Sequence, residues 1–267
     1  MGTYSKYPIK GLIPNFDDLG KVSEKKFGFM QADSESFEEV AKSLGLINKE
    51  NVAWSRHLLA FLMEAADDIC YRIIDLEDGY RIGRVSFSET KNLLELVAFG
   101  EIGNSSPSYE LIDCNDDKGR IEYLRAKAIN NLINEAVEVF KKNYQEIMNG
   151  GYEKDLLTQT KYSSQLGEIK KISREKIYKS PNVLQIEAAG FEVLGGLLEK
   201  IVPALVNEDK NKTLAQEKIC QLIPPQFTKG KSRYERLLNA TDFVSGMTDS
   251  YAVTLYRRLR GIELPRG

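Results

Sequence analysis

A stripe of acidic side chains interrupted by one tyrosine marks the stretch EAADDICYRIIDLED. Its members recur at steps of three and four residues: Glu64, Asp67, Tyr71, Asp75 and Asp78. This spacing places all of them on one face of a helix. Neighbouring carboxylates repel one another unless a cation lies opposite, so the stripe indicates a site for a metal ion or a basic partner. An ordinary solvated acidic face is the alternative, and composition alone favours it.

The helix that carries this stripe is one of several that the apolar pattern predicts. Only eight prolines interrupt the sequence, and apolar residues recur at three- and four-residue spacing, which indicates an all-helical (all-α) fold. After an irregular segment over residues 1–30, we expect helices over residues 34–44, 52–77, 86–99, 118–148, 164–178, 184–201 and 234–259. Gly79 is expected to end the helix that bears the stripe. Ser86 and Glu89 have the spacing of a capping box that opens the next helix.

Composition excludes several classes of protein. Lysine plus arginine number 37 against 39 for aspartate plus glutamate, a net charge of −2, so the chain has no overall basic field for nucleic acid and only a local site stays open. The longest apolar run, Leu58–Met63, is far too short to span a membrane. The start of the sequence does not resemble a signal peptide, and three scattered cysteines fit neither a disulfide framework nor a zinc site, which predicts a cytoplasmic protein. The single histidine, His57, excludes a multi-histidine site built from this chain alone.

Two longer stretches carry a resemblance to a known family. They are RHLLAFLMEAADDICYRIIDLEDG (Arg56–Gly79) and DFVSGMTDSYAVTLYRRL (Asp242–Leu259). Together with RAKAINNLINEAVEVFKKNYQEIMNG (Arg125–Gly150) and the KYP and KKFGF segments near the start, they resemble the deoxyguanosine triphosphate triphosphohydrolase family of HD-domain phosphohydrolases. The resemblance covers essentially the whole chain. It implies an all-helical, homo-oligomeric hydrolase in which a divalent metal such as Mg²⁺ or Mn²⁺ activates water, and which converts a deoxynucleoside triphosphate, dGTP foremost, to deoxynucleoside and tripolyphosphate.

The resemblance also implies roles for residues around the metal and the nucleoside. Asp67 matches the last aspartate of the family's metal-ligand set, and a carboxylate suits a hard divalent ion. Tyr71 and Asp75 match positions that contact the nucleotide, with the tyrosine against the sugar and the carboxylate accepting from the 3′ hydroxyl. For His57 no metal role follows, and we expect it to start a helix.

A second group of residues is implied to meet the phosphates. Lys6 and Tyr7 of SKYP and Lys26 of KKFGF match a basic element that approaches the triphosphate, where a lysine acts as a point charge. For Lys26 a solvated turn is an equal alternative. Arg236, in the matched C-terminal region, is expected to face the polyphosphate.

The family's upstream histidine and His-Asp motifs have no counterpart in this sequence, so we expect a C-terminal portion of such an enzyme. Residues 1–80 are expected to be the end of the catalytic region with its last metal-ligand helix, and residues 81–267 a helical phosphohydrolase-associated region. Two functions stay open. The chain is either part of a hydrolase that needs a separate upstream half for an active metal site, or a noncatalytic nucleotide-binding or oligomer-assembly module. One aspartate is too few ligands for a hydrolytic metal.

Overall fold

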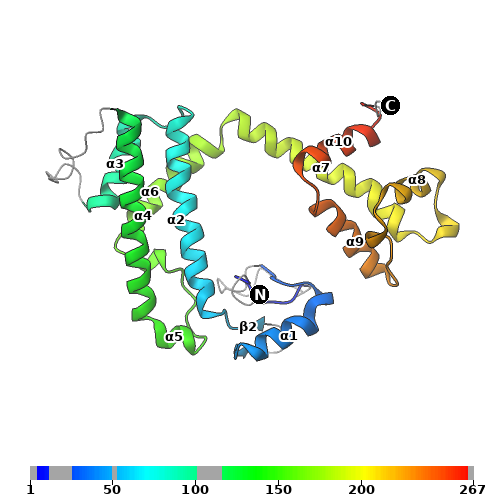
Figure 1. Cartoon of the computed structure of the whole chain (residues 1–267), viewed down its shortest axis with the longest axis horizontal. Helices are drawn as coiled ribbons and strands as arrows, with labels where there is room; N and C mark the ends of the chain where they lie inside the picture. The colour runs from blue at the N-terminus through cyan, green and yellow to red at the C-terminus, as the bar shows by residue number, and fades with distance from the viewer. Residues whose placement is uncertain (1–4, 12–25, 50–52, 101–115, 264–267) are drawn as a thin grey trace. The chain divides into compact units, whose positions relative to one another are not determined.

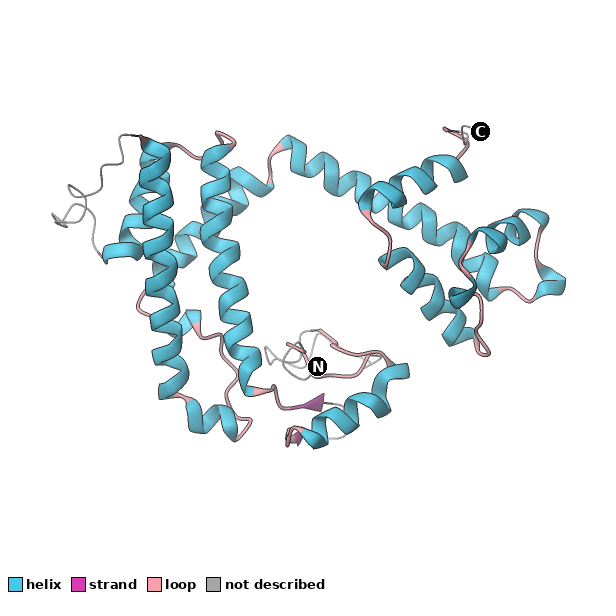
Figure 2. Cartoon of the chain, in the orientation of Figure 1, coloured by secondary structure: helices cyan, strands magenta, loops and turns pink. Residues whose placement is uncertain are grey.

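The structure, a computed structural model, describes residues 5–11, 26–49, 53–100 and 116–263. These residues are mostly helical, with one short antiparallel pair formed by β1 (Asn48–Lys49) and β2 (Ala53–Trp54), as Figures 1 and 2 show. The all-helical fold that the sequence predicts is confirmed. No helix in the described ranges has the length and apolar character needed to cross a membrane.

The chain divides into two compact units, Met1–Lys179 and Ser180–Gly267. The boundary that the sequence placed after residue 80 lies inside a helix, because α2 runs over Leu58–Arg81. The α-helices of the first unit are α1 (Ser34–Ser43), α2, α3 (Phe87–Phe99), α4 (Asp117–Lys142), α5 (Tyr144–Met148) and α6 (Ser163–Ile172). Its remaining helical turns are η3 (Gln31–Asp33), η4 (Leu157–Gln159) and the π-helix η5 (Ser173–Tyr178).

The core of the first unit lies between α2, α3 and α4, which pack side by side (Figure 1). The apolar side of α2 contributes Ile69, Ile73 and Leu76, all essentially inaccessible to solvent. Leu124 and Leu132 of α4 are inaccessible as well and belong to the same cluster. Burying side chains of this size is the main favourable term in folding, so this packing fixes which face of α2 stays outside.

The ends of α2 follow from local chemistry. His57 starts the helix, as expected, and its ring Nδ1 accepts a hydrogen bond from the backbone N–H of Leu59 at 3.3 Å. The expectation that Gly79 ends the helix is wrong, since α2 continues to Arg81. Gly79 has another role: a Cβ atom there would lie 2.5 Å from Ile177 Cδ1, so glycine permits η5 to pack closely on α2.

Residues 5–11 are held beside the start of α2 by backbone hydrogen bonds. The N–H of Trp54 donates to the carbonyl of Pro8 at 2.8 Å, and isolated bridges join Ile9 to Ala53 and Lys10 to Phe29. The side chain of Ile9 is buried. This segment therefore has a defined place next to the helix that carries the acidic stripe.

The second unit consists of α7 (Pro181–Val206), α8 (Leu214–Leu222), α9 (Arg233–Ser245) and α10 (Asp249–Leu259), with the 3₁₀ turns η6 (Asp209–Asn211) and η7 (Pro225–Phe227). Its core includes Leu197, Ile201 and Ala240. The single helix expected over residues 234–259 is in fact α9 and α10, because Thr248 caps a new helix by accepting from the N–H of Tyr251.

Candidate functional site

The acidic stripe lies along α2 as its spacing predicts, but burial divides its members. Glu64 is buried, Asp75 is partly buried, and Asp67 and Asp78 are exposed. Tyr71 keeps 59% of its surface exposed. Within the described part of the chain, no hydrogen bond or ion pair engages the carboxylate of Asp67. The residues of the stripe therefore share one helix face but differ in their exposure to solvent.

Tyr178 of η5 joins this face and was not singled out from the sequence. Its hydroxyl donates a hydrogen bond to Oδ2 of Asp75. Its ring centroid lies 5.9 Å from that of Tyr71, with an angle of 43° between the planes. Burial, and then the hydrogen bond to Asp75, hold the pKa of the Tyr178 phenol above its ordinary value. We call Tyr71, Asp75 and Tyr178 the tyrosine–aspartate cluster.

No short-range pattern marks Tyr178, because Asp75 is 103 residues away in sequence. The one available signal was its position directly before the Lys-Ser-Pro break that precedes α7. Residues at the end of a π-helical stretch often serve functional sites. The position of Tyr178 before this break becomes informative only when the packing of η5 on α2 is known.

A second feature of the same helix face is a buried ion-pair network. Lys6 Nζ lies 2.5 Å from Oε1 of Glu64, and Arg56 Nη1 donates to Oε2 of Glu64 at 2.7 Å. The Glu64 side chain is 5% exposed. Burial raises the pKa of Glu64, whereas the hydrogen bond from Lys6 acts in the opposite direction. Burial alone would lower the pKa of Lys6, but the hydrogen bond and charge of Glu64 outweigh it and raise this pKa.

The structure brings together the two segments that were predicted to carry phosphate-facing groups. The N–H of Gly28 donates to the carbonyl of Ile9 at 2.9 Å, which sets residues 26–29 against residues 7–11. A Cβ atom on Gly28 would lie 1.9 Å from the carbonyl oxygen of Tyr7, so only glycine fits this approach. Tyr7 is half-buried with the Lys6 ammonium 5.7 Å from its ring centroid, and Lys26 is exposed.

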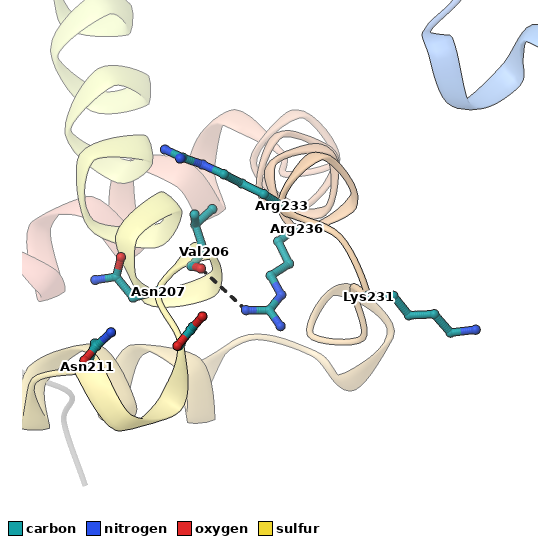
Figure 3. A pocket seen from close by; sticks show the side chains of 7 residues that line it. Val206, Asn207, Asn211, Lys231, Arg233 and Arg236 are labelled. Carbon is teal, nitrogen blue, oxygen red and sulfur yellow. Dashed lines mark hydrogen bonds between the residues drawn. The ribbon is translucent and has the colours of Figure 1, made fainter.

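Arg236, the remaining predicted binding residue, lies in the second unit and lines a polar pocket of about 470 Å³ (Figure 3). Its Nε donates to the carbonyl of Gly230 at 3.0 Å, and Nη1 to that of Val206 at 3.5 Å. Lys231 also lines the pocket, but Figure 3 shows its side chain extending away from Arg236. Arg236 therefore joins α9 to the end of α7 through backbone carbonyls.

The described residues limit which side chains of this structure could hold a metal. Among them, no three His, Cys, Asp or Glu side chains lie close enough together to hold an ion. Asp67 is an exposed carboxylate with the hard oxygen donors that Mg²⁺ and Mn²⁺ prefer. It fits the role of one ligand in a set that other groups complete.

Comparison with known proteins shows what the chain is similar to. Residues 156–258 match the phosphohydrolase-associated domain. A deoxyguanosinetriphosphate triphosphohydrolase-like protein of Synechocystis is 38% identical over 99% of this chain and 59% of its own length.

Two further relatives are also similar to this chain over most of its length. A protein of the same name from Listeria monocytogenes is 30% identical over 97% of this chain and 58% of its own length. A deoxyguanosinetriphosphate triphosphohydrolase of Klebsiella pneumoniae is 29% identical over 90% of this chain and 54% of its own length. The chain is therefore similar in sequence to deoxyguanosinetriphosphate triphosphohydrolase-like proteins along nearly its whole length, and it spans less than two thirds of the length of these relatives.

Proposed function

We propose that this chain takes part in the metal-dependent hydrolysis of a deoxynucleoside triphosphate, dGTP foremost, to deoxynucleoside and tripolyphosphate. The names of its relatives support a nucleotide substrate. The observation that carries the proposal is the tyrosine–aspartate cluster: an exposed aromatic ring and a partly buried carboxylate meet on α2, one and two turns beyond the free carboxylate of Asp67.

In this proposal the cluster binds the nucleoside. The ring of Tyr71 packs on the deoxyribose, and Asp75 accepts a hydrogen bond from the 3′ hydroxyl. Tyr178 acts on Asp75: by donating to one oxygen it fixes the carboxylate orientation and leaves the other oxygen for the sugar. Such preorganisation reduces the entropy lost when the substrate binds.

The phosphates are proposed to bind at the opposite end of the same α2 face, nearer Glu64. Lys6, beside Tyr7, and Lys26 come from two segments that hydrogen-bond to each other. Their ammonium groups attract the triphosphate as point charges. Arg236 of the second unit is proposed separately as a polyphosphate contact, through the guanidinium N–H groups that do not donate to Gly230 and Val206.

Asp67 is proposed as one ligand of a divalent ion. When bound, such an ion lowers the pKa of a water molecule and neutralises phosphate charge. The remaining ligands are proposed to come from a segment that carries the family's upstream histidine and His-Asp motifs.

The test is tripolyphosphate release from dGTP in the presence of Mg²⁺ or Mn²⁺, measured by phosphorus NMR. The 267-residue chain is assayed alone and with a separately produced segment bearing those upstream motifs. We expect release only from the mixture, and its loss with EDTA or with Asp67→Ala. Asp78→Ala removes an equally exposed carboxylate from the same helix and serves as the matched control.

Three outcomes are informative. Hydrolysis that survives Asp67→Ala contradicts the assignment of the metal ligand. Tight dGTP binding without hydrolysis in the mixture favours a noncatalytic nucleotide-binding module. Absence of both binding and hydrolysis rejects the proposed function.

A further inference from the structure

Glu64 differs from the other acidic residues of α2, because both of its oxygens are engaged by cations from elsewhere in the chain. Oε1 meets Lys6 of the N-terminal segment and Oε2 meets Arg56, which precedes the helix. The Arg56 guanidinium also stacks on the ring of Phe61, 4.3 Å from its centroid. The side chains of Arg56 and Glu64 are 2% and 5% exposed. The carboxylate is therefore held from one side by a rigid, buried partner.

This network is an inefficient way to stabilise a fold. Buried ion pairs recover their desolvation cost only when every polar atom is satisfied. Here Arg56 Nη2 and Tyr152 Oη are buried and have no hydrogen-bond partner among the described residues, and the Asp155 carboxylate lies beside that of Glu64. An apolar cluster in this place avoids that cost. The arrangement is better explained by what it does to Lys6.

Lys6 is the exposed end of the network. Its side chain is 38% exposed, against 5% for Glu64. An ammonium group has three N–H donors, and the ion pair with Glu64 directs one of them inward. The other donors are available to a ligand at the solvent-facing side of α2, where Asp68 is close enough to affect the pKa of Lys6.

We propose that Glu64, itself fixed by Arg56, is a positioning residue that holds the Lys6 ammonium at the face of α2 for contact with phosphate groups. The identity of the ligand rests on the proposed function. A free lysine side chain loses conformational entropy when it is immobilised. The ion pair with Glu64 immobilises the Lys6 side chain when the protein folds, so that less conformational entropy is lost when the ligand binds.

The first experiment measures the order of Lys6 without any ligand. Nitrogen-15 NMR of the 267-residue chain detects lysine ammonium groups whose protons exchange slowly, and Lys6→Arg assigns the signal. We expect an ordered Lys6 signal that disappears in Glu64→Gln. Glu135→Gln breaks the Lys161–Glu135 ion pair, which has a separation of 2.7 Å, and is the matched control that keeps the Lys6 signal. An unchanged Lys6 signal in Glu64→Gln overturns the inference.

The second experiment measures binding of inorganic tripolyphosphate with Mg²⁺ by calorimetry in a double-mutant cycle. We expect Glu64→Gln to weaken binding about tenfold when Lys6 is present and less than twofold in the Lys6→Ala background. Equal losses in both backgrounds show that Glu64 does not act through Lys6 and overturn the inference. Should Glu64→Gln melt before the assay temperature, Glu64→Asp keeps the charge but is too short to span both cations, and the same loss is expected.

Deoxyguanosine binding separates this inference from the proposed function, because the nucleoside has no phosphate. If deoxyguanosine binds in a Tyr71-dependent way while tripolyphosphate affinity ignores Lys6→Ala, the positioning role fails and the proposed function survives. If tripolyphosphate binding needs Lys6 and Glu64 while deoxyguanosine does not bind, the positioning role survives and the assignment of the nucleoside site fails.

Discussion

At the scale of single residues, the acidic stripe shows how one helix face accommodates adjacent carboxylates. Repulsion between neighbouring carboxylates on this face is relieved in part by cationic side chains of the same chain. Lys6 and Arg56 pair with Glu64, and Arg72 pairs with Asp68 at 2.8 Å. Asp75 instead accepts a hydrogen bond from the hydroxyl of Tyr178. The carboxylates of Asp67 and Asp78 have no partner among the described residues. Asp67 is the one proposed to meet an external cation, because the resemblance matches it to the family's metal-ligand set.

The hydrogen bond of Tyr178 predicts how stability changes at alkaline pH. The pKa of this phenol is raised in the folded protein, first by burial and then by the hydrogen bond to Asp75. Above pH 10 the phenol ionises more readily in the unfolded chain, which then binds fewer protons than the folded one. The contribution of Tyr178 to stability is therefore complete below about pH 10 and is lost as the pH rises further.

Tyr178→Phe removes this contribution. Urea denaturation between pH 7 and pH 11 should show the variant about 1 kcal/mol less stable than the wild type at neutral pH, because one hydrogen bond is lost. That difference should stay constant to pH 9 and become smaller above pH 10. A constant difference across the whole range contradicts the raised pKa. The same variant should weaken deoxyguanosine binding more than tripolyphosphate binding.

At the scale of elements, the contact between α2 and η5 decides whether the tyrosine–aspartate cluster forms. Gly79 lies where the two elements touch, and its missing side chain leaves space for Ile177. Tyr178 follows Ile177 directly in the chain. The position of the phenol therefore depends on a glycine one helical turn beyond its partner Asp75.

Gly79→Ala tests this dependence. Alanine is the better helix former by about 1 kcal/mol, but its Cβ atom would overlap Ile177 Cδ1 in a packed core, a strain that typically costs about 1–3 kcal/mol. We expect a net loss of stability and weaker nucleoside binding, measured by urea denaturation and calorimetry. Adding Ile177→Val removes the overlapping methyl group and should restore much of the loss.

Gly167→Ala is the matched control for that experiment. Gly167 lies inside α6 and is exposed, and nothing lies within 4 Å of a Cβ atom built on it. This substitution should stabilise the protein by about 0.5–1 kcal/mol. If both glycine substitutions stabilise equally, Gly79 is not a close-packing position.

At the scale of the whole molecule, apolar surface predicts self-association. Phe191 of α7 is 83% exposed, and Leu184 and Leu194, seven residues before it and three after it, are also exposed and lie on the same side of the helix. Contiguous apolar surface on a water-soluble protein commonly marks an interaction site. A homo-oligomer, which the sequence predicts by resemblance, is expected to use this helix.

Light scattering tests the oligomer directly. We expect a mass above the 30.2 kDa of one chain, and a shift toward one chain when Leu184→Ser and Phe191→Ser are combined. Leu214→Ser changes a residue of α8 that is 72% exposed and is the matched control. A mass of one chain at every concentration contradicts the prediction of an oligomer.

The sequence by itself determined what depends on nearby residues. The three- and four-residue spacing predicted the helices and the common face of the acidic stripe, and Ser86 accepts from the N–H of Glu89 as its spacing predicted. The resemblance indicated the relatives correctly. The roles given to the candidate site residues stay predictions: Asp67, Tyr71, Asp75, Lys6, Tyr7, Lys26 and Arg236.

Only the tertiary structure decided what depends on distant residues. The carboxylate of Glu89, expected to complete a capping box, instead pairs with Lys176, 87 residues away. Tyr178 meets Asp75 across 103 residues. Gly79 allows a close contact where its residue type predicted a helix end. Helical periodicity carries information over one or two turns, whereas contacts of this kind form only when the packing of buried faces brings separate elements together.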